Sequence, residues 1–66
     1  MQNHPPTWAD RRAALTASLA AAGVPEPELD ATLLMGHVAG RPRSVVVLSG
    51  PKPWPPALEA ALAPLA

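Results

Sequence analysis

The residues best suited to chemistry in this sequence are an acid and a histidine within residues 29–43, LDATLLMGHVAGRPR. Asp30 and His37 are seven positions apart, and on an α-helix seven steps return to within about 20° of the same face. An acid that orients an imidazole is one way to build a general base. Seven residues span about 10.5 Å along a helix axis, however, which is too far for a direct hydrogen bond. We therefore favour structural roles over a catalytic one: Asp30 stabilises the N-terminal end of its helix or accepts a hydrogen bond from a neighbouring segment, and His37 lies half-buried near the C-terminal end.

Two arginines follow this run and are the candidate partner-binding residues. Arg41 and Arg43 flank Pro42 after a glycine, and a helix, a glycine turn and a second segment with arginines resemble a helix-turn-helix. A recognition helix made of residues 45–48, VVVL, would have no polar face to contact the edges of the bases. We therefore favour a solvated basic loop and expect no nucleic acid as partner.

Sequence signatures of catalysis, cofactor binding and metal binding are missing from the chain. It has no glycine-rich phosphate loop, no GxSxG and no HExxH. The absence of cysteine excludes disulfides and thiolate metal sites, and His4 and His37 are too few and too far apart for a metal site of their own. We expect no catalytic, cofactor-binding or metal-binding residue in these 66 residues.

Length and composition predict one small domain with a limited core. The chain has 66 residues and is 48% hydrophobic, but 14 of the hydrophobic residues are alanines, so the expected stability is marginal. Five basic and five acidic residues give no net charge, which predicts no strong attraction to nucleic acid or to an anionic membrane. Residues 1–8 do not read as a signal peptide, and residues 13–24 are too few to span a bilayer, so we expect a cytoplasmic protein.

The elements that must position these residues are helices, separated by prolines and glycines. Thr7 is a suitable N-cap, and Asp10 completes a capping box with it. Gly23 and Gly40 are suitable helix stops. We predict an all-α, four- to five-helix bundle, with helices over residues 8–22, 27–39, 42–48 and 55–65.

Three positions need separate predictions. Residues 42–48 contain three consecutive valines and favour a strand by propensity, but no other segment could pair with it, so we predict a short buried helix. Gly36 inside the second helix costs about 1 kcal/mol relative to alanine, which suggests the close approach of another helix. Residues 51–56, PKPWPP, read as an extended linker with Trp54 folded inward; Trp8 and Trp54 are expected in the core rather than as stacking platforms.

The larger apolar side chains recur at helical spacing and predict the buried faces of the helices. They are Trp8, Leu15 and Leu19 in the first helix, Leu29, Leu33, Leu34, Met35 and Val38 in the second, and Leu58, Leu62 and Leu65 in the last.

Residues 29–50, LDATLLMGHVAGRPRSVVVLSG, resemble a segment in the N-terminal domain of the release-factor glutamine methyltransferases, the HemK or PrmC family. The matching positions are Leu29, Asp30, Ala31, Leu33, Leu34, His37, Val38, Gly40 and Arg43. The first and last helices also correspond in position, so the resemblance covers about residues 8–65. Two positions depart from the family pattern: Thr32 stands where an acid is usual and Glu28 where a base is common. These departures imply an altered charge on the outer face of the second helix.

The resemblance implies a helical bundle that lies beside a catalytic domain and helps to receive the protein substrate. The family's enzyme methylates the amide nitrogen of the glutamine in the Gly-Gly-Gln motif of translation release factors and uses S-adenosylmethionine. Its Rossmann-like domain and its Asn-Pro-Pro-Tyr motif have no counterpart here, since residues 3–7, NHPPT, lack a tyrosine and the correct spacing.

We therefore expect residues 1–66 to be a single domain of a larger enzyme, without methyl-transfer activity or S-adenosylmethionine binding of its own. Its expected partners are a peptide chain release factor and the enzyme's own catalytic domain. Two alternatives stay open, a free-standing helical interaction module and a minimal helix-turn-helix nucleic-acid binder.

Overall fold

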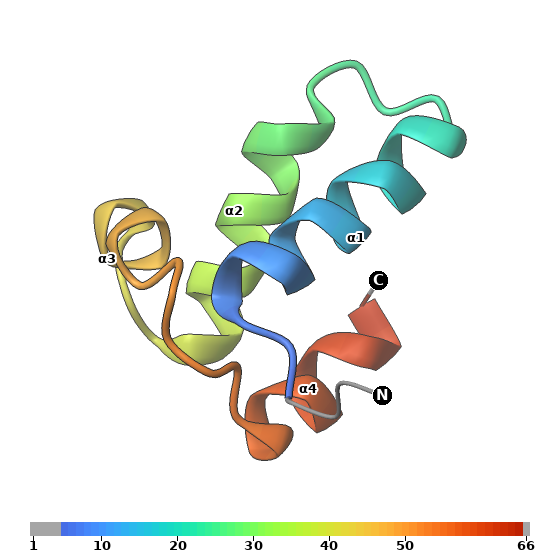
Figure 1. Cartoon of the computed structure of the whole chain (residues 1–66). Coiled ribbons are helices and arrows are strands. Elements are labelled where there is room, and N and C mark those ends of the chain that lie inside the picture. Colours follow the sequence, from blue (N-terminus) through green and yellow to red (C-terminus); the bar gives the residue numbers. More distant parts are fainter. Residues whose placement is uncertain (1–4, 66) are drawn as a thin grey trace.

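Helices make up the regular structure of residues 5–65, which are the residues that this computed structural model describes (Figure 1). The elements are α1 (Trp8–Ala21), α2 (Pro27–Ala39), α3 (Arg43–Leu48), α4 (Pro56–Leu62) and a closing 3-10 turn, η1 (Ala63–Leu65). Within the described range there is no β-strand, only an isolated bridge between Thr7 and Pro53. The predicted all-α bundle is confirmed.

The predicted capping box begins α1. The Thr7 hydroxyl accepts from the Asp10 backbone N–H at 3.1 Å, and the Asp10 carboxylate accepts from the Thr7 N–H at 3.0 Å. These two bonds satisfy donors that a helix start leaves without partners inside the helix. At the other end α1 stops at Ala21, one residue earlier than predicted, and Gly23 turns the chain with a φ of 85°.

The linker between α3 and α4, residues 49–55, satisfies the backbone N–H donors of the first two residues of α1. Its carbonyl groups accept from the N–H groups of the helix start, so the remaining orphan donors of the first turn are also paired. The bonds run from Trp8 N to Lys52 O (2.9 Å) and from Ala9 N to Gly50 O (3.1 Å), while Trp54 N donates in return to Pro6 O (2.9 Å). The segment before α1 and the linker are thereby joined side by side.

The bounds of α2 are as predicted, from Pro27 to Ala39, and Gly40 ends it in the left-handed region with a φ of 65°. Its glycine, Gly36, allows a close approach. A Cβ at this position would lie 2.8 Å from the carbonyl oxygen of Arg41 and 3.5 Å from a methyl group of Val46. The nearest group is therefore the backbone of the α2–α3 loop, with α3 behind it, rather than the helix that we expected.

The valine-rich segment is helical, as predicted, but only one of its valines is buried. Val46 is 2% exposed, whereas Val47 is 49% exposed and Leu48 is 78% exposed. Consecutive residues on a helix differ by about 100°, so a helix that packs on one side cannot bury the whole run. The prediction of a buried helix is wrong for its outer half.

The last helix is shorter than predicted. It starts at Pro56 and ends at Leu62, and Ala63–Leu65 continue as a 3-10 turn. Pro64 has no N–H to donate, and its ring would collide with the carbonyl group four residues earlier in a continuing α-helix. The chain therefore tightens, and Leu65, which we expected to be buried, is 50% exposed.

The core lies between α2 and its neighbours, because α2 packs against α1, α3 and α4. Trp8 and Trp54 meet edge to face with ring centroids 4.7 Å apart, which confirms both as core residues. Leu33 is 51% exposed, contrary to our prediction. It is two residues from the buried Met35, which corresponds to about 200° around the helix, so it faces away from the core. The buried apolar residues are Trp8, Leu15, Ala31, Met35, Val46, Trp54 and Leu62. Within residues 5–65, no helix has the length and apolarity that a membrane span requires.

Candidate functional site

The structure places Asp30 and His37 at opposite ends of α2. Asp30 lies in the first turn, where a negative charge is favoured, and is half-buried. Its carboxylate has no hydrogen-bond partner within the described part of the chain, so the second of its two alternative roles, a contact with a neighbouring segment, is not present. His37 lies in the last turn but is exposed rather than half-buried. The two side chains are not brought together.

The exposure of His37 follows from the face that α2 buries. That face contains Ala31, Thr32, Met35 and Gly36. His37 is rotated by about 200° from Met35, so its imidazole lies on the solvent side. Residues 5–65 hold no group of three or more acidic or histidine side chains that could share a metal ion.

Arg41 and Arg43 lie at the corner between α2 and α3, and both are exposed. The backbone N–H of Arg41 donates to the carbonyl oxygen of Gly36 at 2.9 Å, which fixes the start of the corner. Arg43 is the first residue of α3 rather than part of a loop. Neither arginine forms an ion pair with the described residues, so both guanidinium groups are available to a partner.

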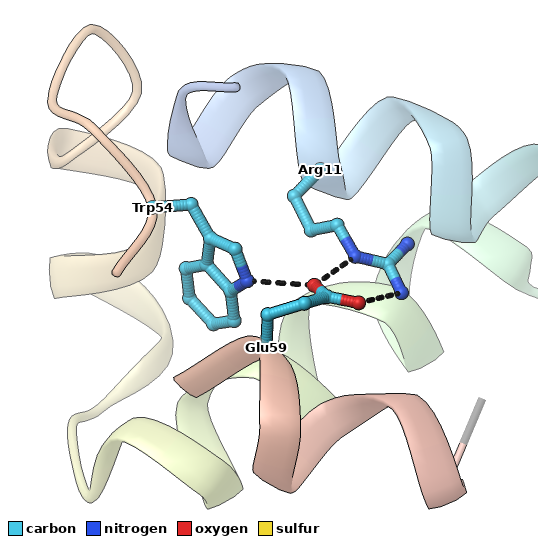
Figure 2. A network of polar contacts seen from close by, with 3 residues as sticks. All are labelled: Arg11, Trp54 and Glu59. Atoms are coloured by element: carbon cyan, nitrogen blue, oxygen red, sulfur yellow. Dashed lines mark hydrogen bonds and ion pairs between the residues drawn. The ribbon is translucent and has the colours of Figure 1, made fainter. Parts of the chain in front are cut away.

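A polar cluster that the sequence did not reveal joins α1, the linker and α4 (Figure 2). The carboxylate of Glu59 accepts two bonds from Arg11, at 2.6 Å from Nε and 3.2 Å from a terminal nitrogen. The same carboxylate accepts from the indole N–H of Trp54 at 2.9 Å. The hydrogen bond from Arg11 lowers the pKa of Glu59; burial partly opposes this, and the bond from Trp54 adds to it.

This cluster is suited to holding the bundle together rather than to proton transfer. A general base works best with a pKa near the operating pH, whereas the pKa of Glu59 lies below its usual value. Both carboxylate oxygens also have donors already. The only hint in the sequence is that Glu59 is the first acid after Asp30 and follows a tryptophan by five residues. Neither fact identifies Arg11 as its partner.

A shallow groove of about 550 Å³ runs between α1 and α2. Small side chains of α1 line one wall, with Arg12 of α1 and Glu28 of α2 at the groove. Thr32 is 5% exposed and its hydroxyl donates to the carbonyl oxygen of Glu28 at 2.9 Å. The predicted effect of Thr32 on the outer face of the helix is therefore wrong, because this side chain faces α1. The full lining is Ala9, Arg12, Ala13, Thr16, Ala17, Ala20, Glu28, Leu29 and Thr32.

Comparison with known proteins identifies the family. Residues 10–66 match the family model of the PrmC N-terminal domain, a range that extends from the first turn of α1 beyond η1. A search of curated proteins and a search of solved structures each find no match. The matched range contains all four candidate residues, Asp30, His37, Arg41 and Arg43, and confirms the resemblance seen in the sequence. The chain therefore belongs to the PrmC N-terminal domain family, the N-terminal domains of methyltransferases.

Proposed function

We propose that this bundle is the substrate-recognition domain of an enzyme that methylates the glutamine of the Gly-Gly-Gln motif in peptide chain release factors. The family match over residues 10–66 is the observation that carries the proposal. In this role the domain supplies contacts far from the reacting atoms. Such contacts orient a large substrate and can lower the barrier of a reaction in which they take no direct part.

The described side chains suit a contact surface better than a reaction centre. Asp30 and His37 lie at opposite ends of α2, and Glu59 is engaged by Arg11 and Trp54. The partners in this proposal are the release factor and the enzyme's own catalytic domain. Because release factors act in translation termination, the proposal also implies a cytoplasmic location.

The methyl donor, S-adenosylmethionine, does not fit the described residues. Dinucleotide-type sites place the ligand at the end of a strand, on a glycine-rich turn that opens a helix, with an acid for the ribose. Residues 5–65 contain no strand that could build such a turn, and Gly23 and Gly40 end helices rather than open them. We therefore assign donor binding to the catalytic domain.

The helix-turn-helix alternative has less support than the protein-binding one. A recognition helix presents polar side chains to base edges. The exposed residues of α3 are Arg43, Ser44, Val47 and Leu48, and the last two are apolar. A steep loss of duplex DNA binding as salt is added would nevertheless favour this alternative.

The proposal is tested by removing residues 1–66 from the enzyme that carries them. Methyl transfer is measured with an intact release factor and with a short peptide that contains Gly-Gly-Gln. We expect the deletion to raise the KM for the intact factor while the rate with the peptide changes little. An equal loss on both substrates would contradict the proposal, because the domain would then only support the folding of the catalytic domain.

A further inference from the structure

α3 has an outer face on which two apolar residues lie beside one cationic and one neutral polar residue. Arg43 and Val47 are four residues apart, as are Ser44 and Leu48, so each pair shares one side of the helix. All four residues are exposed, while Val46 points into the core. We call these four residues the α3 ridge. In Figure 1, α3 lies at the left edge of the bundle, beside α2, against which it packs.

The ridge places two large apolar side chains in solvent side by side. Leu48 is 78% exposed and Val47 is 49% exposed. Single exposed leucines are common on protein surfaces and need no explanation. Here, however, the core has few large residues, and yet two neighbouring ones are left outside it. The pair is therefore a candidate contact point.

The backbone holds both ends of the ridge in place. Before α3, the N–H of Arg41 is bonded to Gly36 of α2. After α3 the chain forms turns, with hydrogen bonds from Gly50 N to Val47 O (3.3 Å) and from Lys52 N to Ser49 O (2.9 Å). Carbonyl groups of the same linker accept from the backbone N–H groups at the start of α1. A contact presented on a fixed backbone loses little conformational entropy when it binds.

The charged residues nearest to the ridge along the sequence are all positive. Arg41 precedes it, Arg43 lies within it and Lys52 follows it, and none of the three forms an ion pair with residues 5–65. The sequence has no aspartate or glutamate between Asp30 and Glu59. The acids of α2 lie in its first turn, and the helix is about 20 Å long, so they are at the end remote from α3.

We propose that the α3 ridge docks on an acidic protein surface that has an apolar pocket for Leu48. The proposal rests on the proposed function, because it assigns that surface to the protein substrate of the enzyme. Carboxylates on the partner would complement the three cations, and the pocket would take the leucine. Nucleic acid would satisfy the cations through its phosphates but would leave Val47 and Leu48 without apolar contacts. A protein partner satisfies both kinds of group.

The arrangement also predicts what each part contributes to binding. A buried apolar anchor surrounded by polar groups carries most of the energy of many interfaces. Charges at the rim mainly accelerate association and make it sensitive to salt. Leu48 should therefore control how long the complex lasts, and Arg43 should control how fast it forms.

The test compares two exposed leucines in the enzyme that carries this domain. Leu48→Glu removes the anchor and adds a repulsive charge, Leu48→Ser removes the anchor alone, and Leu33→Ser is the matched control on α2, where the leucine is 51% exposed. The KM and kcat for an intact release factor and for a short Gly-Gly-Gln peptide are measured for each variant. The melting temperature is measured too, although these exposed positions are not expected to affect folding.

We expect Leu48→Ser to raise the KM for the intact factor about tenfold, and Leu48→Glu to raise it further. The kcat, the kinetics with the peptide and the Leu33→Ser control should not change. A normal KM for the factor in both Leu48 variants would overturn the docking surface while leaving the proposed function intact. Absence of methylation of the factor by the unmodified enzyme would instead overturn the proposed function and the partner assigned here. Salt-sensitive binding of duplex DNA that Arg43→Glu abolishes and Leu48→Ser spares would overturn the proposal in favour of nucleic acid.

Discussion

Glu59 offers a direct test of how α4 is attached to the rest of the bundle. Its carboxylate accepts from Arg11 on α1 and from the indole of Trp54 in the linker. Glu59→Gln retains an amide oxygen that can accept from the indole but removes the negative charge. Glu59→Ala removes both interactions. The two variants therefore separate the ion pair from the hydrogen bond.

The expected losses of stability differ because the two partners differ in exposure. The side chains of Arg11 and Glu59 are 18% and 41% exposed, so solvent screens the ion pair and its loss should cost about 0.2–1 kcal/mol. Trp54 is 3% exposed. In Glu59→Ala its buried N–H loses its acceptor, which adds about 1–3 kcal/mol.

Thermal unfolding of the 66-residue chain, followed by circular dichroism, measures both variants. For a domain of this size 1 kcal/mol corresponds to about 4–8 °C in Tm. Glu59→Gln should therefore lower the Tm by a few degrees and Glu59→Ala by about 10 °C. Equal losses in the two variants would refute the reasoning, because the bond to Trp54 would then contribute nothing.

The pH dependence of stability provides a second check on Glu59. The pKa of this carboxyl is lowered from its ordinary value of 4.5 in the folded chain. A lowered pKa means that the folded state binds the proton less tightly than the unfolded state. The contribution is therefore complete above pH 4.5 and is lost as the pH falls through the lower, folded-state pKa. Unfolding of Glu59→Gln should depend less on pH in this acidic range.

Three further predictions concern single substitutions in α2. Gly36→Ala should lower the free energy of unfolding by about 1–3 kcal/mol despite the better helix propensity of alanine, because its Cβ would lie 2.8 Å from the Arg41 carbonyl oxygen. Ser18→Ala on the exposed side of α1 is the control. A Gly36→Ala variant that is more stable than the unmodified chain would contradict the close approach. Asp30→Asn should cost about 0.3–1 kcal/mol through the helix dipole, and His37→Gln less than about 0.5 kcal/mol at its exposed position. In the complete enzyme, Asp30→Asn and His37→Gln should reduce the methylation rate only as far as they reduce the folded fraction. A variant of either residue with a normal Tm but little activity would reveal a functional role.

Local signals in the sequence predicted the helices well. Thr7 and Asp10 form the capping box that their spacing indicates, and Gly40 ends α2 where expected. These features depend only on residues a few positions apart, so the sequence contains all the information. The helical state of α3 was also predictable, because a lone strand would have left its backbone groups unpaired.

The orientation of the helices was less predictable. Leu33 and Leu48 are apolar but exposed, and His37 is more exposed than expected. Each of these side chains lies on the solvent side of its helix. Which side of a helix faces the core depends on the packing of the whole bundle. The Arg11–Glu59 pair joins residues 48 positions apart, and no local pattern identifies it.

The contacts that fold this domain also determine how it could present α3 to a partner. Gly36 lets the Arg41 backbone come close to α2, which fixes where α3 begins. The linker after α3 is bound to the start of α1 and buries Trp54, which fixes where α3 ends. Glu59 then holds that tryptophan from α4. The position of Leu48 depends on both of these backbone contacts. If Leu48 contacts the substrate as proposed, a change that loosens either contact should weaken binding of the substrate from a distance.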